Sequence, residues 1–353
     1  MCEDVEKTPS RRGMLKVGTA ALAAGAAGAV LTGGAGQAAS ATPDPKPART
    51  RFALLPREAK PLPMGPDGYR LDRIGPEMYA VTGAPGVQAA FVVSSAGVIV
   101  VDAPPPLATA LPAAIRKVTE KPVTHLIYAH QHADHIANAR VFGDVVRIAH
   151  AETARLIHNE QDPARPMPTV TFNDRYTLTV GDQRLELSYP GVNHDAGNII
   201  IHAPRQRVAM MVDVVIPGWA PFRAWGTADS VPGVLRTHDV LAGLDIDTFV
   251  GGHIHRLGTP EDIKVSREFV YDLWNNTTDV MATTHMDTYL AQVEEGNLWA
   301  GFRLWFEAIA DKVEPMIYRK WLHRLGAVDV FTRENIQTIA LSHAIDAPQD
   351  LSF

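Results

Sequence analysis

The chain has 353 residues, of which 46% are hydrophobic, and this is enough apolar material for a substantial folded core. Its formal net charge of −6 at pH 7 lacks the basic excess that binding to nucleic-acid phosphates leaves in a sequence. Composition therefore argues against a nucleic-acid partner, and we expect a folded globular protein.

The N-terminal segment has the features of a twin-arginine export signal. Arg11 and Arg12 precede a weakly apolar, Ala- and Gly-rich stretch at residues 17–31, which is too short for a comfortable membrane span. Residues 39–41 (Ala-Ser-Ala) supply the small side chains that a signal peptidase accepts. We expect a signal peptide at residues 1–41, a Pro-rich leader at residues 42–70, no stable membrane anchor, and a periplasmic or extracellular location.

Cysteine chemistry is excluded from the expected mature protein. Cys2 is the only cysteine of the chain and lies in the segment that we expect to be removed. The mature protein would then have neither disulfides nor thiolate metal ligands. Any metal must be held by histidines and carboxylates.

The rest of the chain alternates predicted strands with predicted helices. Apolar runs bounded by turn residues predict strands at residues 78–81, 90–93, 98–101, 124–128, 145–148, 176–180, 184–189, 199–202, 208–212 and 248–250. Helical periodicity covers residues 107–119, 151–159 and 231–241, and the chain from Pro260 onward reads as four or five helices. Hairpins interleaved with helices in two rounds favour a sheet-on-sheet core with helices on its outer faces.

Four metal-binding side chains lie within six residues, directly after the predicted strand at 124–128. His130, His132 and Asp134 are spaced by two, so in an extended segment they face one point, and His135 turns inward as the next helix starts. Zinc prefers such nitrogen and oxygen donors, and a site that keeps an open position can bind water. The segment therefore predicts a metal site at the end of this strand.

The pattern His-x-His-x-Asp-His after a strand resembles the signature of the metallo-β-lactamase superfamily. Downstream, His194, Asp213 and His253 resemble the remaining ligands in order, and Asp102 resembles the structural aspartate behind the histidine loop. The resemblance implies a four-layer αβ/βα sandwich at residues 71–265, followed by a helical C-terminal extension at residues 266–353.

The resemblance also implies two zinc ions per chain and a hydrolytic mechanism. One zinc would be held by His130, His132 and His194 and the second by Asp134, His135 and His253, with Asp213 bridging them. Two cations lower the pKa of a bridging water, so that hydroxide exists near neutral pH, while Asp134 acts as the catalytic carboxylate. Aspartate at the bridging position makes the chain resemble the glyoxalase II and lactonase branches.

Three features depart from the family pattern. His255 follows His253 where the family has one histidine, and we favour His253 as the ligand. Asp195 follows His194 directly, and its simplest role is to orient a histidine. Three aromatic residues crowd the loop after Asp213 and would either line an apolar substrate pocket or pack against the C-terminal helices: Trp219, Phe222 and Trp225.

The expected function is hydrolysis of a carbonyl substrate, which is an ester, lactone, thioester or amide such as a β-lactam. Two alternatives remain open: a single-iron oxidoreductase like the persulfide dioxygenases, which share this fold, and a non-catalytic metal-binding accessory protein of the cell envelope. An aromatic stripe on the C-terminal helices would pack either onto the sandwich or into a second subunit as a homodimer: Trp299, Phe302, Trp305 and Phe306.

Overall fold

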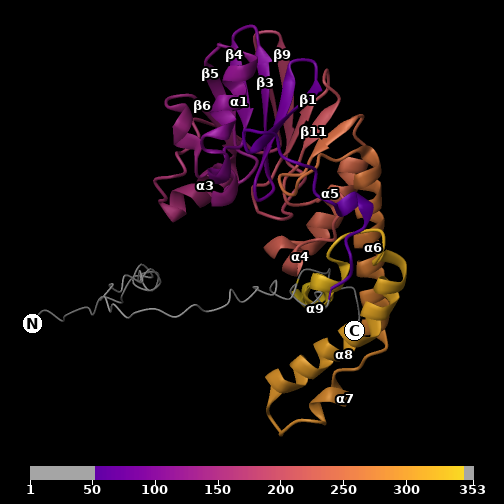
Figure 1. Ribbon diagram of the computed structural model, residues 1–353. Coiled ribbons are helices and arrows are strands. Elements are labelled where there is room, and N and C mark those ends of the chain that lie inside the picture. Colours follow the sequence, from indigo (N-terminus) through magenta and orange to yellow (C-terminus); the bar gives the residue numbers. More distant parts are fainter. Residues whose placement is uncertain (1–51, 346–353) are drawn as a thin grey trace, which may run out of the picture. The chain divides into compact units, whose positions relative to one another are not determined.

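The computed structural model describes residues 52–345 (Figure 1). The expected signal peptide, Cys2 and the first part of the expected leader lie outside the described residues. Among residues 52–345, none of the helices combines the length and the apolar character that a bilayer span needs.

The first sheet has seven strands that follow one another in chain order. Strands β1 to β4 pair antiparallel, and β4 to β7 pair parallel. The strands are β1 (Tyr69–Gly75), β2 (Met78–Gly83), β3 (Val87–Ser94), β4 (Gly97–Val101), β5 (Val123–Ile127), β6 (Val146–His150) and β7 (Val170–Phe172).

The second sheet has five strands in the order β12-β11-β10-β9-β8. Its pairings are antiparallel except for β11 with β12, which run parallel. The strands are β8 (Arg175–Val180), β9 (Gln183–Ser188), β10 (Ile200–Ala203), β11 (Val208–Met210) and β12 (Thr248–Val250).

The helices cover the outer faces of both sheets. On the first sheet lie α1 (Ala110–Val118), α2 (Ala133–Ile136), α3 (Ala151–Glu160) and the short turns η3 (Pro105–Leu107) and η4 (Ala139–Phe142); η2 (Arg57–Ala59) precedes β1. On the second lie α5 (Val231–Ala242) and α6 (Pro260–Ala282). Helices α8 (Leu298–Trp321) and α9 (Val328–Ile345) pack against α6 and against each other, α4 (Arg223–Thr227) packs against α9, and α7 (Asp287–Leu290) packs against α8.

Three apolar clusters define four layers. The central cluster joins side chains of both sheets, among them Ile99 and Ile127 from the first and Leu187 and Met210 from the second. A second cluster packs α1 and α3 on the first sheet. A third joins the second sheet to α5 and α6 and continues between α6, α8 and α9. The predicted αβ/βα sandwich with C-terminal helices is therefore confirmed, and Figure 1 shows α1 over the first sheet and α6 beside the second.

Two strands and two boundaries differ from the sequence-based expectations. The predictions missed β1 and β7, because β1 carries three charged residues among its seven and β7 has only three residues. Strand β1 begins at Tyr69, within the segment expected to be leader. Residues 265 and 266, where we expected the C-terminal extension to begin, both lie inside α6, whose first turn is closed by a capping box between Thr259 and Asp262.

Candidate metal centre

The candidate site lies where the parallel strands of both sheets end. Strands β4 and β5 end at the same edge of the first sheet, and β11 and β12 end together in the second. Asp102 directly follows β4, and the segment from His130 to His135 follows β5. Asp213 lies three residues after the end of β11, and His253 lies three residues after the end of β12. The sandwich brings the four strand ends together, so side chains distant in sequence meet there.

Backbone conformation turns the two aspartates into the site. Asp102 and Asp213 have φ angles of 60° and 65°, in the left-handed region that aspartate tolerates better than most residues. The Asp213 N–H donates to the carbonyl of Gly251 at 3.2 Å, which ties the end of β11 to the His253 loop. Each strand end is therefore bent so that its carboxylate points at the histidines.

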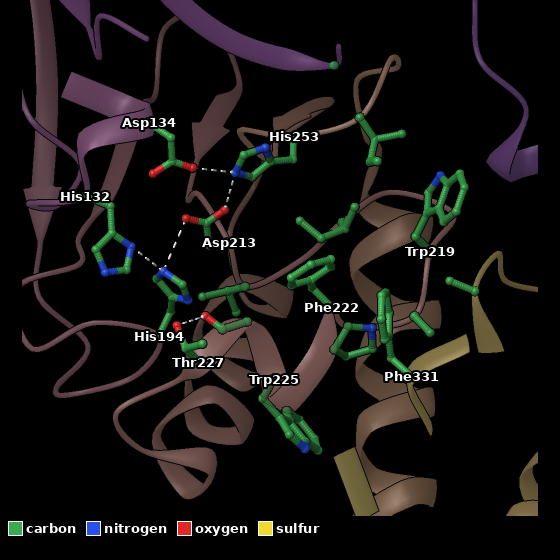
Figure 2. A pocket seen from close by; sticks show the side chains of 18 of the residues that line it. His132, Asp134, His194, Asp213, Trp219, Phe222, Trp225, Thr227, His253 and Phe331 are labelled. Atoms are coloured by element: carbon green, nitrogen blue, oxygen red, sulfur yellow. Dashed lines mark hydrogen bonds and ion pairs between the residues drawn. The ribbon is translucent and has the colours of Figure 1, made fainter. Parts of the chain in front are cut away.

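The first ligand group consists of His130, His132, His194 and Asp213, whose ligand atoms all lie within 4.8 Å of one another. His132 Nδ1 lies 3.1 Å from His194 Nε2. Asp213 Oδ2 lies 3.3 Å from His194 Nε2 and 3.5 Å from His130 Nε2. Figure 2 shows His132, His194 and Asp213 pointing toward one another.

The second ligand group consists of Asp134, His135 and His253, also within 4.8 Å of one another. His135 Nε2 lies 3.1 Å from His253 Nε2, and Asp134 Oδ2 lies 3.6 Å from His253 Nε2. Asp213 joins the two groups, since its Oδ1 lies 2.9 Å from His253 Nε2 and its Oδ2 lies 3.1 Å from His135 Nε2. The structure thus brings all seven predicted ligands together.

The donor set fits bound metal ions. His130 Nε2 is fully buried without a hydrogen-bond partner, although it faces Asp213 Oδ2 at 3.5 Å. A buried nitrogen without a partner is unfavourable unless something else satisfies it. Bonds of about 2.0 to 2.1 Å to a tetrahedral metal separate its ligands by roughly 3.3 Å, which is close to the distances between these donors.

The electrostatics of the cluster favour a cation. Burial lowers the pKa of His130 well below its ordinary value, so this imidazole keeps a free lone pair. Burial would raise the pKa of Asp213, but the charge and hydrogen bond of His135 hold that pKa well below its usual range. Burial would likewise lower the pKa of His135, but Asp213 and Asp102 raise it well above its ordinary value. Asp213 therefore carries a buried negative charge that is stable only beside a positive charge, which either a protonated His135 or a bound cation can supply.

Two aspartates support the ligands from behind. Asp102 is fully buried; its Oδ1 accepts the Ala129 N–H at 2.8 Å and its Oδ2 lies 3.6 Å from His135 Nδ1. Asp195 Oδ2 lies 3.8 Å from His132 Nε2 and accepts the Gln131 side-chain amide at 3.2 Å. In each pair the carboxylate faces one ring nitrogen of the histidine, and the other ring nitrogen faces the ligand cluster. This is the arrangement expected for residues that orient metal ligands.

The loop of His253 separates the two candidate histidines. Gly252 has a φ of 85°, and a Cβ there would lie 2.8 Å from the Val212 side chain and 3.0 Å from His135 Cε1, so only glycine fits. His253 enters the second ligand group, whereas His255 Nε2 lies 3.1 Å from the Pro85 carbonyl. The structure therefore groups His253, and not His255, with the other candidate ligands.

This separation predicts different metal contents for two alanine variants. His253→Ala should lower the occupancy of the second site, because it removes one of that site's three donors. His255→Ala should keep the wild-type metal content and change only the packing against Pro85. Metal analysis of the purified variants checks this, and equal losses in both would show that the loop is arranged differently.

A cavity of about 670 Å³ opens beside the metal centre. Its wall on one side is formed by His132, Asp134, His194, Asp213 and His253. The opposite wall is mostly apolar and includes the three aromatic residues of the loop after Asp213, together with Phe331 of α9 (Figure 2). Trp219, Phe222 and Trp225 thus line the cavity, and the nearly buried Trp225 packs into the core as well.

Sequence reasoning missed two parts of this site. Phe331 lies 118 residues after Asp213 on a helix whose pattern showed only packing, so no local signal pointed to it. Arg165, which is 9% exposed, donates to the Gln131 carbonyl and side chain at 2.8 Å each and so holds the residue between His130 and His132. An arginine in a loop gives no signal of such a role in the sequence, so this contact is seen only in the folded structure.

Comparisons with known proteins agree with this arrangement. A family model described as the metallo-β-lactamase superfamily matches residues 83–253. The 2,4-dinitroanisole O-demethylase subunit alpha of Nocardioides sp. (strain JS1661) is 29% identical over 220 residues, which cover 60% of this chain and 62% of that protein. The chain thus spans less than two thirds of the length of this curated relative. A solved metallo-β-lactamase from Pontibacter korlensis superposes with a TM-score of 0.50 at 20% identity, covering 57% of this chain and 99% of its own, and shows the fold.

Proposed function

We propose, from the premise that residues 83–253 form a domain of the metallo-β-lactamase superfamily, that this protein is a zinc-dependent hydrolase of a carbonyl substrate. The substrate would be an ester, lactone, thioester or amide. The observation that carries the proposal is the convergence of seven metal donors on one wall of a cavity large enough for a small molecule.

The chain's own residues have distinct roles in this proposal. His130, His132 and His194 would hold one zinc, Asp134, His135 and His253 the other, and Asp213 would contact both. Bound in this way, the two ions would lower the pKa of a water molecule and polarise the carbonyl. Asp134, whose side chain is 58% exposed, would accept a hydrogen bond from the attacking water and orient it.

Access to the donors argues against a purely structural metal site. The side chains of His132 and His253 are 31% and 30% exposed, and both line the cavity. Trp219 and Trp225 leave the cavity open, so the aromatic loop does not seal the donors from a substrate. This favours catalysis over the alternative of a non-catalytic envelope accessory protein.

The complete second ligand group favours two metals over one. A single-iron oxidoreductase needs only two histidines and one aspartate, and these are present here with four further donors. Asp134, His135 and His253 converge independently of the three histidines of the first group. This arrangement favours the dinuclear hydrolase over the single-iron alternative.

A second candidate reaction is O-demethylation of an aryl methyl ether. The similarity to a protein named 2,4-dinitroanisole O-demethylase subunit alpha favours it, as does the aromatic wall of the cavity. In a hydrolytic site this reaction would consume water, break the bond between the aryl carbon and the ether oxygen, and release a phenol and methanol. Oxidation states would not change, so the same donors would serve both candidates.

Metal analysis combined with a substrate panel tests the proposal. The zinc-loaded protein should contain two zinc ions per chain and hydrolyse at least one of a lactone, a thioester, an aryl ester and a β-lactam. Methanol release from 2,4-dinitroanisole would favour the second candidate. One iron per chain with no hydrolysis of any of these compounds would overturn both candidates.

A further inference from the structure

We propose that the cavity beside the metal centre binds an uncharged aromatic group of the substrate, and that helix α9 of the C-terminal extension completes this binding site. The inference rests on the proposed function, which it deepens by naming the substrate class. It uses residues outside the metal ligands, which neither the ligand pattern nor the hydrolytic chemistry explains.

The charge of the lining favours a neutral group. None of the described residues that line the cavity is a lysine or arginine. The charged carboxylates of the lining are Asp134 and Asp213, and both belong to the metal end. An anionic substituent turned away from the metals would therefore lose its hydration without gaining a positive partner, which is unfavourable.

The shape of the apolar wall favours an aromatic ring. Phe222 and Phe331 meet edge to face, with ring centroids 4.8 Å apart at 64°. Phe222 is 63% exposed, so much of its ring is available to a ligand. Trp219 and Ile216 extend the same wall, and a cavity of about 670 Å³ accommodates a one- or two-ring group. Ring faces and edges of this kind bind another ring more strongly than area alone would give.

Helix α9 holds this wall in place as well as contributing to it. The Asn335 side chain accepts the Trp225 backbone N–H at 2.8 Å and donates to the Pro221 carbonyl at 3.0 Å. The Trp225 indole N–H donates to the Asn335 carbonyl at 3.0 Å. The Ala220 N–H donates to the Gly326 carbonyl at 2.9 Å, just before α9 begins.

These anchors act on a strained segment. Ala224, Trp225 and Thr227 have φ angles of 50°, 57° and 63°, and the left-handed region is unfavourable for residues that carry a Cβ. Such a turn persists only where its surroundings determine it. The C-terminal extension is therefore a structural part of the substrate site, and Phe331 is the residue through which α9 reaches the ligand.

The test compares two esters that share an acetyl group. We expect Phe331→Ala to lower kcat/KM for 2-naphthyl acetate about 10-fold more than for ethyl acetate, mainly through KM, because only the naphthyl ring reaches the aromatic wall. Phe222→Ala should act in the same direction. The Phe222 side chain is exposed, so its truncation should leave the fold intact. Trp299→Ala, an 82% exposed aromatic residue of α8 outside this cavity, is the matched control and should leave the ratio of the two esters unchanged.

A charged probe and a binding measurement complete the design. Wild type should hydrolyse the anionic 6-acetoxy-2-naphthoate at least about 10-fold less efficiently than 2-naphthyl acetate. Calorimetric titration with 2-naphthylmethanol, which has no ester to cleave, should show binding that Phe331→Ala weakens. Equal effects of Phe331→Ala on both acetates, or unweakened binding of 2-naphthylmethanol, would overturn the aromatic site. Ring binding that depends on Phe331 without hydrolysis of any ester would instead overturn the proposed function alone.

Discussion

Asp213→Asn should remove metal from both ligand groups and lower turnover by more than about 10²-fold. The carboxylate lies between both groups, with its Oδ1 2.9 Å from His253 Nε2 and its Oδ2 3.3 Å from His194 Nε2. Asparagine keeps the size but has no negative charge and only one acceptor oxygen. The four histidines that surround it would then hold two cations without the carboxylate placed between them.

Metal content and turnover of the purified variant measure this effect. Asp279→Asn is the matched control, because Asp279 is an exposed aspartate on α6 and its replacement removes the same charge far from the donors. The control should keep both metals and its activity. If Asp213→Asn retained two zinc ions per chain and turned over within about twofold of wild type, Asp213 would not be the shared ligand.

The first half of the metal centre could be predicted from sequence because it is local. His130, His132, Asp134 and His135 lie in one loop after one strand, so side-chain periodicity alone indicates that they converge. His194, Asp213 and His253 could be proposed only through the resemblance to a family. Their approach to His130 depends on two sheets packing face to face, which no short-range pattern encodes.

The substrate wall could not be predicted for a physical reason. Phe331 reaches the cavity because α9 packs on the loop before α5, and that contact is set by tertiary packing between distant segments. The left-handed turn around Trp225 could not be predicted from local sequence either, since the segment carries one glycine and no turn signature for four consecutive positive φ angles. Sequence therefore indicated the metal chemistry, and the fold was needed to see what surrounds it.

The remaining large effect concerns Asp134, which differs from Asp213 in its exposure. Its Oδ2 lies 3.6 Å from His253 Nε2 and 3.8 Å from His135 Nε2, so this oxygen faces the second ligand group. Figure 2 shows the other oxygen turned away from His253. The side chain is 58% exposed and lines the cavity, so a substrate and its attacking water can reach it. One carboxylate can therefore both anchor a metal and accept a proton.

Asp134→Asn should lower turnover on a true substrate by a factor of about 10² or more, the scale of losing one acid/base group, while the fold stays intact. The second site should lose metal, because a neutral amide replaces a charged donor, whereas His130, His132 and His194 should still hold the first. This partial loss separates the variant from Asp213→Asn, which should empty both sites. Turnover and metal content measured together decide the matter: near-normal hydrolysis with one metal bound would make the second site dispensable and would favour single-metal chemistry.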